Sequence, residues 1–182
     1  MKSNSNIRAV TFAAVTVGLL YTAMAYPAEE PAQAASLADA ITGGKLLLNL
    51  RPRYELVDQD GKPEDAKAFT LRSLVGWETK PWHSFSLTAQ AINVSRLGSL
   101  DYNDDATKAA ASRFPLVADP DDSDINQLFV DYTGLPKTRI RFGRQSIKID
   151  NVRFIGNVEF RQVMQVFNGV LLENKSLPNT EF

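Results

Sequence analysis

The sequence contains no cysteine and a single histidine, His83. It therefore has neither a thiol nucleophile nor the Cys and His side chains that build most zinc sites. Without disulfides, a secreted domain of this size must be held together by a large core, by ligands or by a membrane. The G-x-S-x-G turn of many hydrolases is missing, and so are the glycine-rich loops that bind phosphates and dinucleotides. His83 follows Pro81-Trp82 in a short turn, and an interfacial turn residue is its better interpretation. We expect a protein that is not an enzyme and that needs no cofactor.

Long hydrophobic runs are also scarce, and the one that exists lies at the N-terminus. Lys2 and Arg8 form a basic region before an uncharged, mostly apolar stretch over residues 9–20. After it, Ala23-Met24-Ala25 supplies the small residues that signal peptidase requires. The run is shorter than the ~20 residues of a membrane-spanning helix. We predict a cleaved signal peptide over residues 1–25 and a flexible leader, rich in Ala, Pro and Glu, over residues 26–44. Loss of Lys2 and Arg8 leaves a slightly acidic chain, which argues against nucleic-acid binding.

Beyond the leader, apolar and polar residues alternate with a period of two. In residues 45–58, Leu46, Leu48 and Leu50 alternate with polar residues such as Asn49. The same alternation runs through residues 67–79, 85–95, 127–132 and 139–143, with a weaker pattern over residues 164–173. This period is that of a β-strand with one apolar and one polar face. The first three runs are longer than the average soluble strand of about five or six residues.

The connections between these segments alternate in length. Those over residues 80–83, 134–138 and 174–179 are short, and those over residues 58–66, 96–124 and 150–161 are long. Outer-membrane barrels have short periplasmic turns and longer external loops, and a first strand that runs outward places a long loop first, as here. Aromatic residues near the short turns, namely Trp77, Trp82, Phe85 and Tyr132, are expected to form an interfacial girdle. A soluble β-sandwich with these aromatics in its core is the alternative.

The most distinctive segment runs from Phe142 to Gln162 and reads FGRQSIKIDNVRFIGNVEFRQ. It resembles the alginate export family of outer-membrane porins, and shorter pieces similar to that family occur from Leu46 to the end. These pieces are Leu71-Arg72, Val117-Ala118-Asp119-Pro120, Asn126-Gln127 and Asn174-Lys175-Ser176-Leu177-Pro178. The resemblance implies a barrel of about 16–18 strands through which solutes pass without an energy source.

The strand count falls short of such a barrel. The residues before Phe182 do not alternate as a closing strand does, and bacterial single-chain barrels begin at about eight strands. In lipid, the open edges of a smaller sheet leave backbone groups unpaired. We therefore expect an all-β fold: an antiparallel up-and-down transmembrane β-barrel that is incomplete, with about six strands of a larger barrel. Residues 45–182 are then the N-terminal part of that barrel.

The arginines are the candidate functional residues. Arg51, Arg53, Arg72, Arg139 and Arg141 fall on the polar faces of their strands, and Arg144, Arg153 and Arg161 lie in or near the family-like segment. The direction of Arg144 depends on a bulge expected near Gly143. A ring of guanidinium groups in a narrow lumen favours anions and binds carboxylates in a fork. The alternative is that they pair with carboxylates such as Glu55, Glu78, Asp131 and Glu159 and only stabilise the barrel.

The connection over residues 96–124 is rich in aspartate, and we expect a solvated external loop. A weaker hypothesis places a low-affinity Ca²⁺ site at Asp119, Asp121, Asp122 and Asp124. The residue pattern of an EF-hand is absent, so we expect no resident metal.

Together these features predict an outer-membrane channel for the passive transport of small, anionic or carboxylated solutes. The expected partners are outer-membrane lipid, the transported solutes and the barrel assembly machinery, and no nucleic acid. A soluble periplasmic β-sheet protein that binds a ligand is the first alternative. An outer-membrane barrel enzyme is the second, but the sequence shows no nucleophile and base pair for it.

Overall fold

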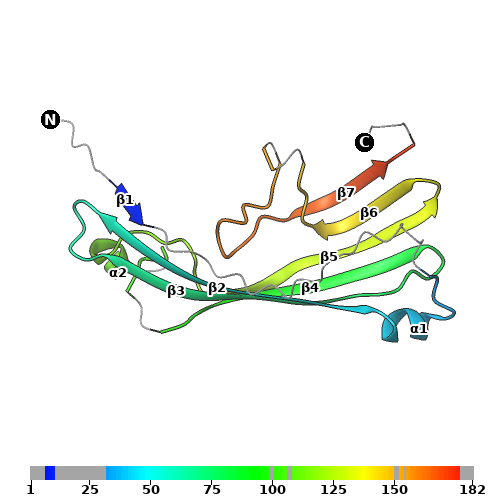
Figure 1. Ribbon diagram of the computed structural model, residues 1–182, viewed down its shortest axis with the longest axis horizontal. Helices are drawn as coiled ribbons and strands as arrows, with labels where there is room; N and C mark the ends of the chain where they lie inside the picture. Colours follow the sequence, from blue (N-terminus) through cyan, green and yellow to red (C-terminus); the bar gives the residue numbers. More distant parts are fainter. Residues whose placement is uncertain are drawn as a thin grey trace.

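The computed structural model describes residues 7–10, 32–98, 101–105, 108–149, 152–153 and 155–176. Its centre is one antiparallel sheet in which each strand is hydrogen-bonded to the next in sequence. Figure 1 shows the sheet curving into an open trough. The six long strands are β2 (Lys45–Gln59), β3 (Ala66–Glu78), β4 (Phe85–Arg96), β5 (Asp122–Leu135), β6 (Thr138–Gln145) and β7 (Phe167–Asn174). The prediction of an incomplete up-and-down barrel with about six strands is confirmed.

The two ends of the trough differ. One, the turn end, carries the β3–β4 and β5–β6 turns, and the other, the loop end, carries the β2–β3, β4–β5 and β6–β7 connections. A further short strand, β1 (Ile7–Val10), pairs with β2 at the loop end, from Ile7↔Gln59 to Val10↔Leu56. β1 falls within the predicted signal peptide, and the rest of that peptide lies outside the described residues.

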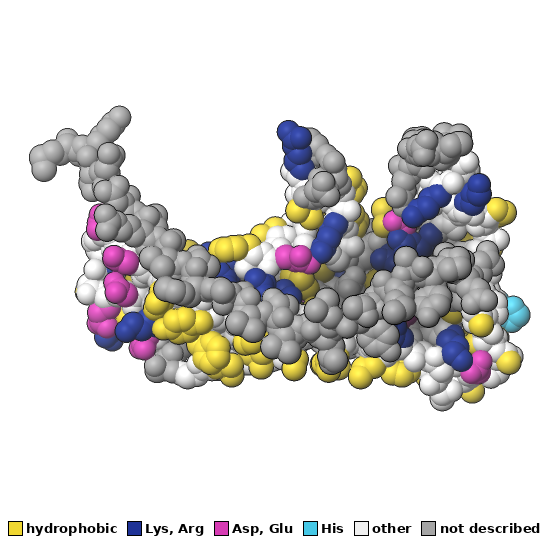
Figure 2. All heavy atoms as spheres, viewed as in Figure 1, with side chains coloured by type: hydrophobic (Ala, Val, Ile, Leu, Met, Phe, Trp, Pro, Cys, Tyr) yellow, Lys and Arg dark blue, Asp and Glu magenta, His cyan; other side chains and the backbone are white. Residues whose placement is uncertain are grey.

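Apolar side chains cover the convex face of the sheet because the strands alternate with a period of two. Phe142 is 68% exposed and Val170 is 65% exposed, which is far from the burial that a soluble sandwich gives to such residues. Figure 2 shows hydrophobic side chains along the lower, convex edge, and Lys and Arg side chains in the hollow above it. Other exposed members of this face are Leu46, Leu48, Leu50, Tyr54, Phe69, Val75, Trp77, Leu87, Leu128, Val130 and Leu172. This is the distribution of a barrel wall that faces lipid.

The concave face is covered by two connections that fold back onto it. Tyr102, Phe114 and Val117 from the β4–β5 connection pack on Val57 and Ala66 near the loop end. This connection includes the helix α2 (Lys108–Arg113). Because Val117 is fully buried, the expectation of a solvated external loop over residues 96–124 is wrong for this part of it.

The second cover is the β6–β7 connection, residues 146–166, which we call the inward loop. Its Met164 packs against Leu74, Ile92 and Val94 in the middle of the trough. Residues 150, 151 and 154 of the inward loop lie outside the described residues. The weak pattern over residues 164–173 thus predicts β7, but Met164 itself belongs to the inward loop.

The predicted flexible leader contains a helix, α1 (Leu37–Thr42), at the turn end. Ser36 caps it by accepting a hydrogen bond from the Asp39 N–H at 3.1 Å, and Gly43 follows its last turn. The structure therefore has a helix at Leu37–Thr42 within the predicted leader, while residues 26–31 lie outside the described residues. Neither α1 nor α2, the helices of the described residues, is long and apolar enough to cross a membrane.

Gly143 has a φ of +134°, and a Cβ there would press on the Leu128 carbonyl oxygen. The register is continuous through it on both sides, with Phe129↔Gly143 and Gly143↔Gly169. The expected bulge near Gly143 is thus replaced by a glycine in a conformation that other residues rarely adopt. A register shift does occur in β4–β5, between Gln90 and Ala91.

Candidate functional site

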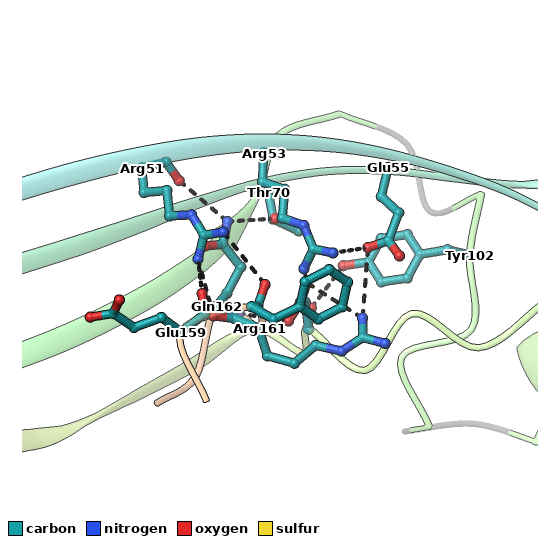
Figure 3. Close-up of polar contacts among 10 residues, drawn as sticks. Arg51, Arg53, Glu55, Thr70, Tyr102, Glu159, Arg161 and Gln162 are labelled. Atoms are coloured by element: carbon teal, nitrogen blue, oxygen red, sulfur yellow. Dashed lines mark hydrogen bonds and ion pairs between the residues drawn. The ribbon is translucent and has the colours of Figure 1, made fainter. Parts of the chain in front are cut away.

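The inward loop is tied to the first two long strands by Gln162, which is fully buried. Its Nε2 donates to Thr70 Oγ1 of β3 at 2.8 Å and to the Arg51 carbonyl oxygen of β2 at 3.3 Å (Figure 3). These contacts join residues about a hundred positions apart, so the loop crosses the concave face instead of leaving the sheet. A loop folded into a barrel in this way narrows the lumen.

Asp119 of the β4–β5 connection is the hub of the buried network. Its Oδ1 accepts from the Gln162 N–H at 2.9 Å, and its Oδ2 accepts from Arg53 Nη1 at 2.7 Å. Its carbonyl oxygen accepts from the Tyr102 hydroxyl at 3.1 Å. Asp119 therefore connects both covering loops to β2. Burial raises the pKa of Tyr102 to about 12, so this hydroxyl remains a donor at neutral pH.

Arg53 and Arg161 lie on a pair of carboxylates. Arg53 is 2.6 Å from Glu55 as well as 2.7 Å from Asp119, and Arg161 is 3.6 Å from Glu55. The Phe160 ring lies between the two guanidinium groups, at 4.6 Å from that of Arg53 and 5.1 Å from that of Arg161. In this group of side chains positive and negative charges balance.

Arg51 and Arg72 differ from their neighbours. They face each other as register partners in β2 and β3. Arg51 donates only to carbonyl oxygens of the inward loop, those of Glu159 at 2.5 Å, Arg161 at 3.3 Å and Phe160 at 3.5 Å. Arg72 donates to Asn49 Oδ1 at 3.3 Å, while its Nε and Nη1 are buried without an acceptor. Among the described residues, neither guanidinium has a carboxylate within 4.0 Å. Neither guanidinium is thus neutralised by a direct ion pair, and the Glu159 carboxylate acts on both only from beyond that distance.

Two further arginines near the turn end are fully paired. Arg141 forms a two-pronged contact with Asp131, with both N–H···O distances at 2.7 Å, and its guanidinium lies 3.7 Å from the centre of the Phe129 ring. Arg139 pairs with Glu173. These contacts are cross-strand ion pairs, as expected if the two arginines stabilise the sheet.

Arg144 and Arg153 complete the predicted set. Arg144 lies 2.6 Å from Asp124 of β5. Arg153 is an exposed residue of the inward loop. The structure therefore brings Arg51, Arg53 and Arg72 of the sheet together with Arg161 of the inward loop. It places Arg139, Arg141 and Arg144 in ion pairs elsewhere.

The four aspartates of the calcium hypothesis do not converge. Asp119 is bound to Arg53, Asp121 lies 2.6 Å from Arg96 Nε, and Asp124 pairs with Arg144. Asp122 accepts from the N–H of the next residue, Ser123. Within the part of the chain that the structure describes, no group of three or more His, Asp or Glu side chains is placed to hold a metal ion.

The inward loop carries an exposed ion pair. Lys148 donates to Glu159, and Asn157 Nδ2 donates to the same carboxylate at 3.0 Å. Hydrogen bonds from Lys148 and then Asn157 lower the pKa of Glu159 below its ordinary value, more than partial burial raises it.

Gln162, Thr70 and Tyr102 were not singled out from the sequence. Thr70 lies on the polar face of a predicted strand, so its inward direction follows from alternation. Gln162 and Tyr102 lie in connections, where no periodicity indicates which way a side chain points.

A comparison with protein families found a match for the chain. The family model described as "Alginate export" matches residues 34–181. No curated protein and no solved structure matches the chain.

Proposed function

The chain belongs to the alginate export family, a family of outer-membrane transport porins, and on this premise we propose that it forms part of a passive channel for small anionic, carboxylate-bearing solutes. Its convex face contacts outer-membrane lipid, and its concave face lines the lumen. Export proceeds through the predicted signal peptide, and the barrel assembly machinery inserts the strands. Alginate, a carboxylated polysaccharide, belongs to the class of solute that such a lumen accepts.

The observation that carries this proposal is the pairing of Arg51 with Arg72. Two like charges that face each other across neighbouring strands destabilise a sheet unless an anion lies between or beside them. Arg72 is only 7% exposed and still has two N–H groups without an acceptor. A carboxylate is the ligand that a guanidinium binds with two parallel hydrogen bonds. An anion that passes the inward loop therefore supplies the hydrogen-bond acceptors that Arg72 lacks within the protein.

The same contacts narrow the set of arginines that act on solutes. Arg53, Arg139, Arg141, Arg144 and Arg161 each have a carboxylate at ion-pair distance. Their charges are largely cancelled within the protein, which supports the stabilising role that the sequence left open for them. Arg51 and Arg72 supply the net positive charge that favours anions over cations.

The test is ion selectivity of the full-length protein in planar bilayers under a salt gradient. Arg51→Gln with Arg72→Gln removes two positive charges without adding a negative one, and the ratio of anion to cation permeability should fall by roughly twofold or more. Arg113→Gln is the matched control, since Arg113 pairs with Glu64 at an exposed site of the covering loop. Equal selectivity in the double variant and the control would remove the role assigned to Arg51 and Arg72.

A further inference from the structure

The helix α1 presents an apolar face that the protein does not cover. Leu37 is 55% exposed and Ile41 is 52% exposed. They are four residues apart and so lie on one side of a helix, one turn after the other. Ala40 is 2% exposed and forms the side that rests on the sheet. The helix is too short to be stable alone, so its contacts with the sheet fix where this apolar face points.

Those contacts place α1 on the outer side of the trough. Trp77 belongs to the convex face, where it is the register partner of Leu46, and its Nε1 donates to the Ile41 carbonyl oxygen at 2.8 Å. The β3–β4 turn also binds this segment. The Lys80 N–H donates to the Ala40 carbonyl oxygen at 3.0 Å, and the Ala34 N–H donates to the Pro81 carbonyl oxygen at 2.7 Å. A helix bound to an outward-pointing tryptophan lies outside the lumen, at the rim.

The helix α1 lies next to the apolar belt of the sheet, because its Ile41 carbonyl oxygen is bound to Trp77 of that belt. Trp77 and Leu46 are exposed where β2 and β3 meet α1, and Leu48 continues the belt along β2. In Figure 1, α1 extends the sheet at its turn end. On the opposite side of the helix, Asp39 pairs with Lys80 at 3.5 Å. The helix is therefore amphipathic, with its apolar side in line with the barrel wall and its polar side towards the turn.

We propose that Leu37 and Ile41 of α1 lie in the headgroup and acyl boundary of the periplasmic leaflet, so that α1 anchors the rim of the barrel to phospholipid. The inference rests on the proposed function, since it takes the turn end as the periplasmic end. An amphipathic helix parallel to the surface buries its apolar face by about 5–10 Å. Trp77 is the residue type that favours this interface, and its hydrogen bond to α1 holds the helix at that depth.

The absence of cysteine from the chain makes a direct test possible. Single variants Leu37→Cys and Ile41→Cys of the full-length protein are labelled with a fluorophore and folded into phosphatidylcholine nanodiscs. Quenching is measured with a phosphatidylcholine that carries a nitroxide near its headgroup, and with iodide in water. Val75→Cys reports on the convex belt of β3, and Thr42→Cys on the exposed side of α1 that is turned about 100° from Ile41. Retained heat-shifted gel mobility shows that each variant is folded.

The proposal expects strong lipid quenching and weak iodide quenching at positions 37, 41 and 75, with the reverse at position 42. Lipid quenching at position 75 alone, with iodide reaching 37 and 41, overturns the anchor and leaves the channel intact. Protection of 37 and 41 from both quenchers shows a protein cover and also overturns it. Absence of lipid quenching at position 75 counts against the channel itself.

Discussion

Arg53 Nη1 lies 2.7 Å from Asp119 Oδ2, and the two side chains are 4% and 1% exposed. They belong to β2 and to the β4–β5 connection, 66 positions apart, and their contact lies at the point where both covering loops meet the barrel wall. Removal of one partner of a buried ion pair leaves the other charge uncompensated. If Asp119 is removed, Arg53 still pairs with Glu55, which reduces the destabilisation.

The first prediction concerns this contact. Asp119→Asn should lower the free energy of unfolding by about 2–3 kcal/mol, because it removes the charge that faces Arg53. The measurement is the urea midpoint at which folded gel mobility is lost. Asp121→Asn is the control, since its exposed pair with Arg96 is worth at most about 1 kcal/mol. Equal midpoints for the two variants would show that the Asp119 network does not stabilise the barrel.

The second prediction concerns the inward loop. Gln162→Leu removes the donor to Thr70 Oγ1 and to the Arg51 carbonyl oxygen, and a lost buried hydrogen bond costs about 1–3 kcal/mol. The loop should then leave the concave face for part of the time, and single-channel conductance should rise with added fluctuations. Gln165→Leu changes an exposed residue of the same loop and should leave the conductance unchanged. A Gln162 variant with the conductance of the parent would mean that this loop does not narrow the lumen.

The third prediction uses the two glycines that face each other in β6 and β7. Gly143→Ala should cost about 1–3 kcal/mol, because the residue has a φ of +134° and an added Cβ meets the Leu128 carbonyl oxygen. Gly169→Ala adds the same methyl group opposite, where no atom lies within 4 Å. It should be neutral or slightly stabilising. Thermal loss of folded gel mobility compares the two, and similar midpoints would contradict the strained conformation of Gly143.

The fourth prediction concerns pH. The pKa of Glu159 is lowered by its hydrogen bonds with Lys148 and Asn157, so its contribution is present above its ordinary value of 4.5 and is lost as the pH falls through the lowered value. Because the pair is exposed, the effect is below about 1 kcal/mol. Cleavage of the inward loop by pepsin, which is active in acid, should therefore quicken modestly as the pH falls through this range. Glu159→Gln should remove this pH dependence. If the cleavage rate of the parent protein does not change with pH, the Glu159–Lys148 pair does not help to hold the loop in place.

The strands could be predicted from the sequence because their signal is local. Alternate residues of a strand point to opposite faces, so the positions of Leu46, Arg51, Arg72 and Trp77 on the sheet followed from their parity alone. The start of β5 was missed: it begins at Asp122, where polar residues in succession hide the alternation. The unusual backbone of Gly143 was placed correctly but was taken for a bulge.

The connections could not be predicted because their contacts are distant. Gln162 meets Thr70 across 92 positions, and nothing in the adjacent sequence indicates this partner. For the same reason, parity could not show which arginines meet a carboxylate, although it placed five of them on the polar faces of their strands: Arg51, Arg53, Arg72, Arg139 and Arg141. The helix α1 was read as a leader since one short turn of Ala and Leu has no periodicity to measure, and the contact with Trp77 decides its place.

The pairing of β1 with β2 has a consequence for the order of events in assembly. The edge of β2 that faces away from β3 can pair with one strand at a time, and β1 occupies this edge from Leu56 to Gln59. If residues 1–25 are removed as predicted, the occupant leaves with them, and that edge becomes open to another strand. Cleavage would then control whether another strand can pair with β2. A chain that keeps its first residues blocks this edge with β1, and a cleaved chain leaves the edge free.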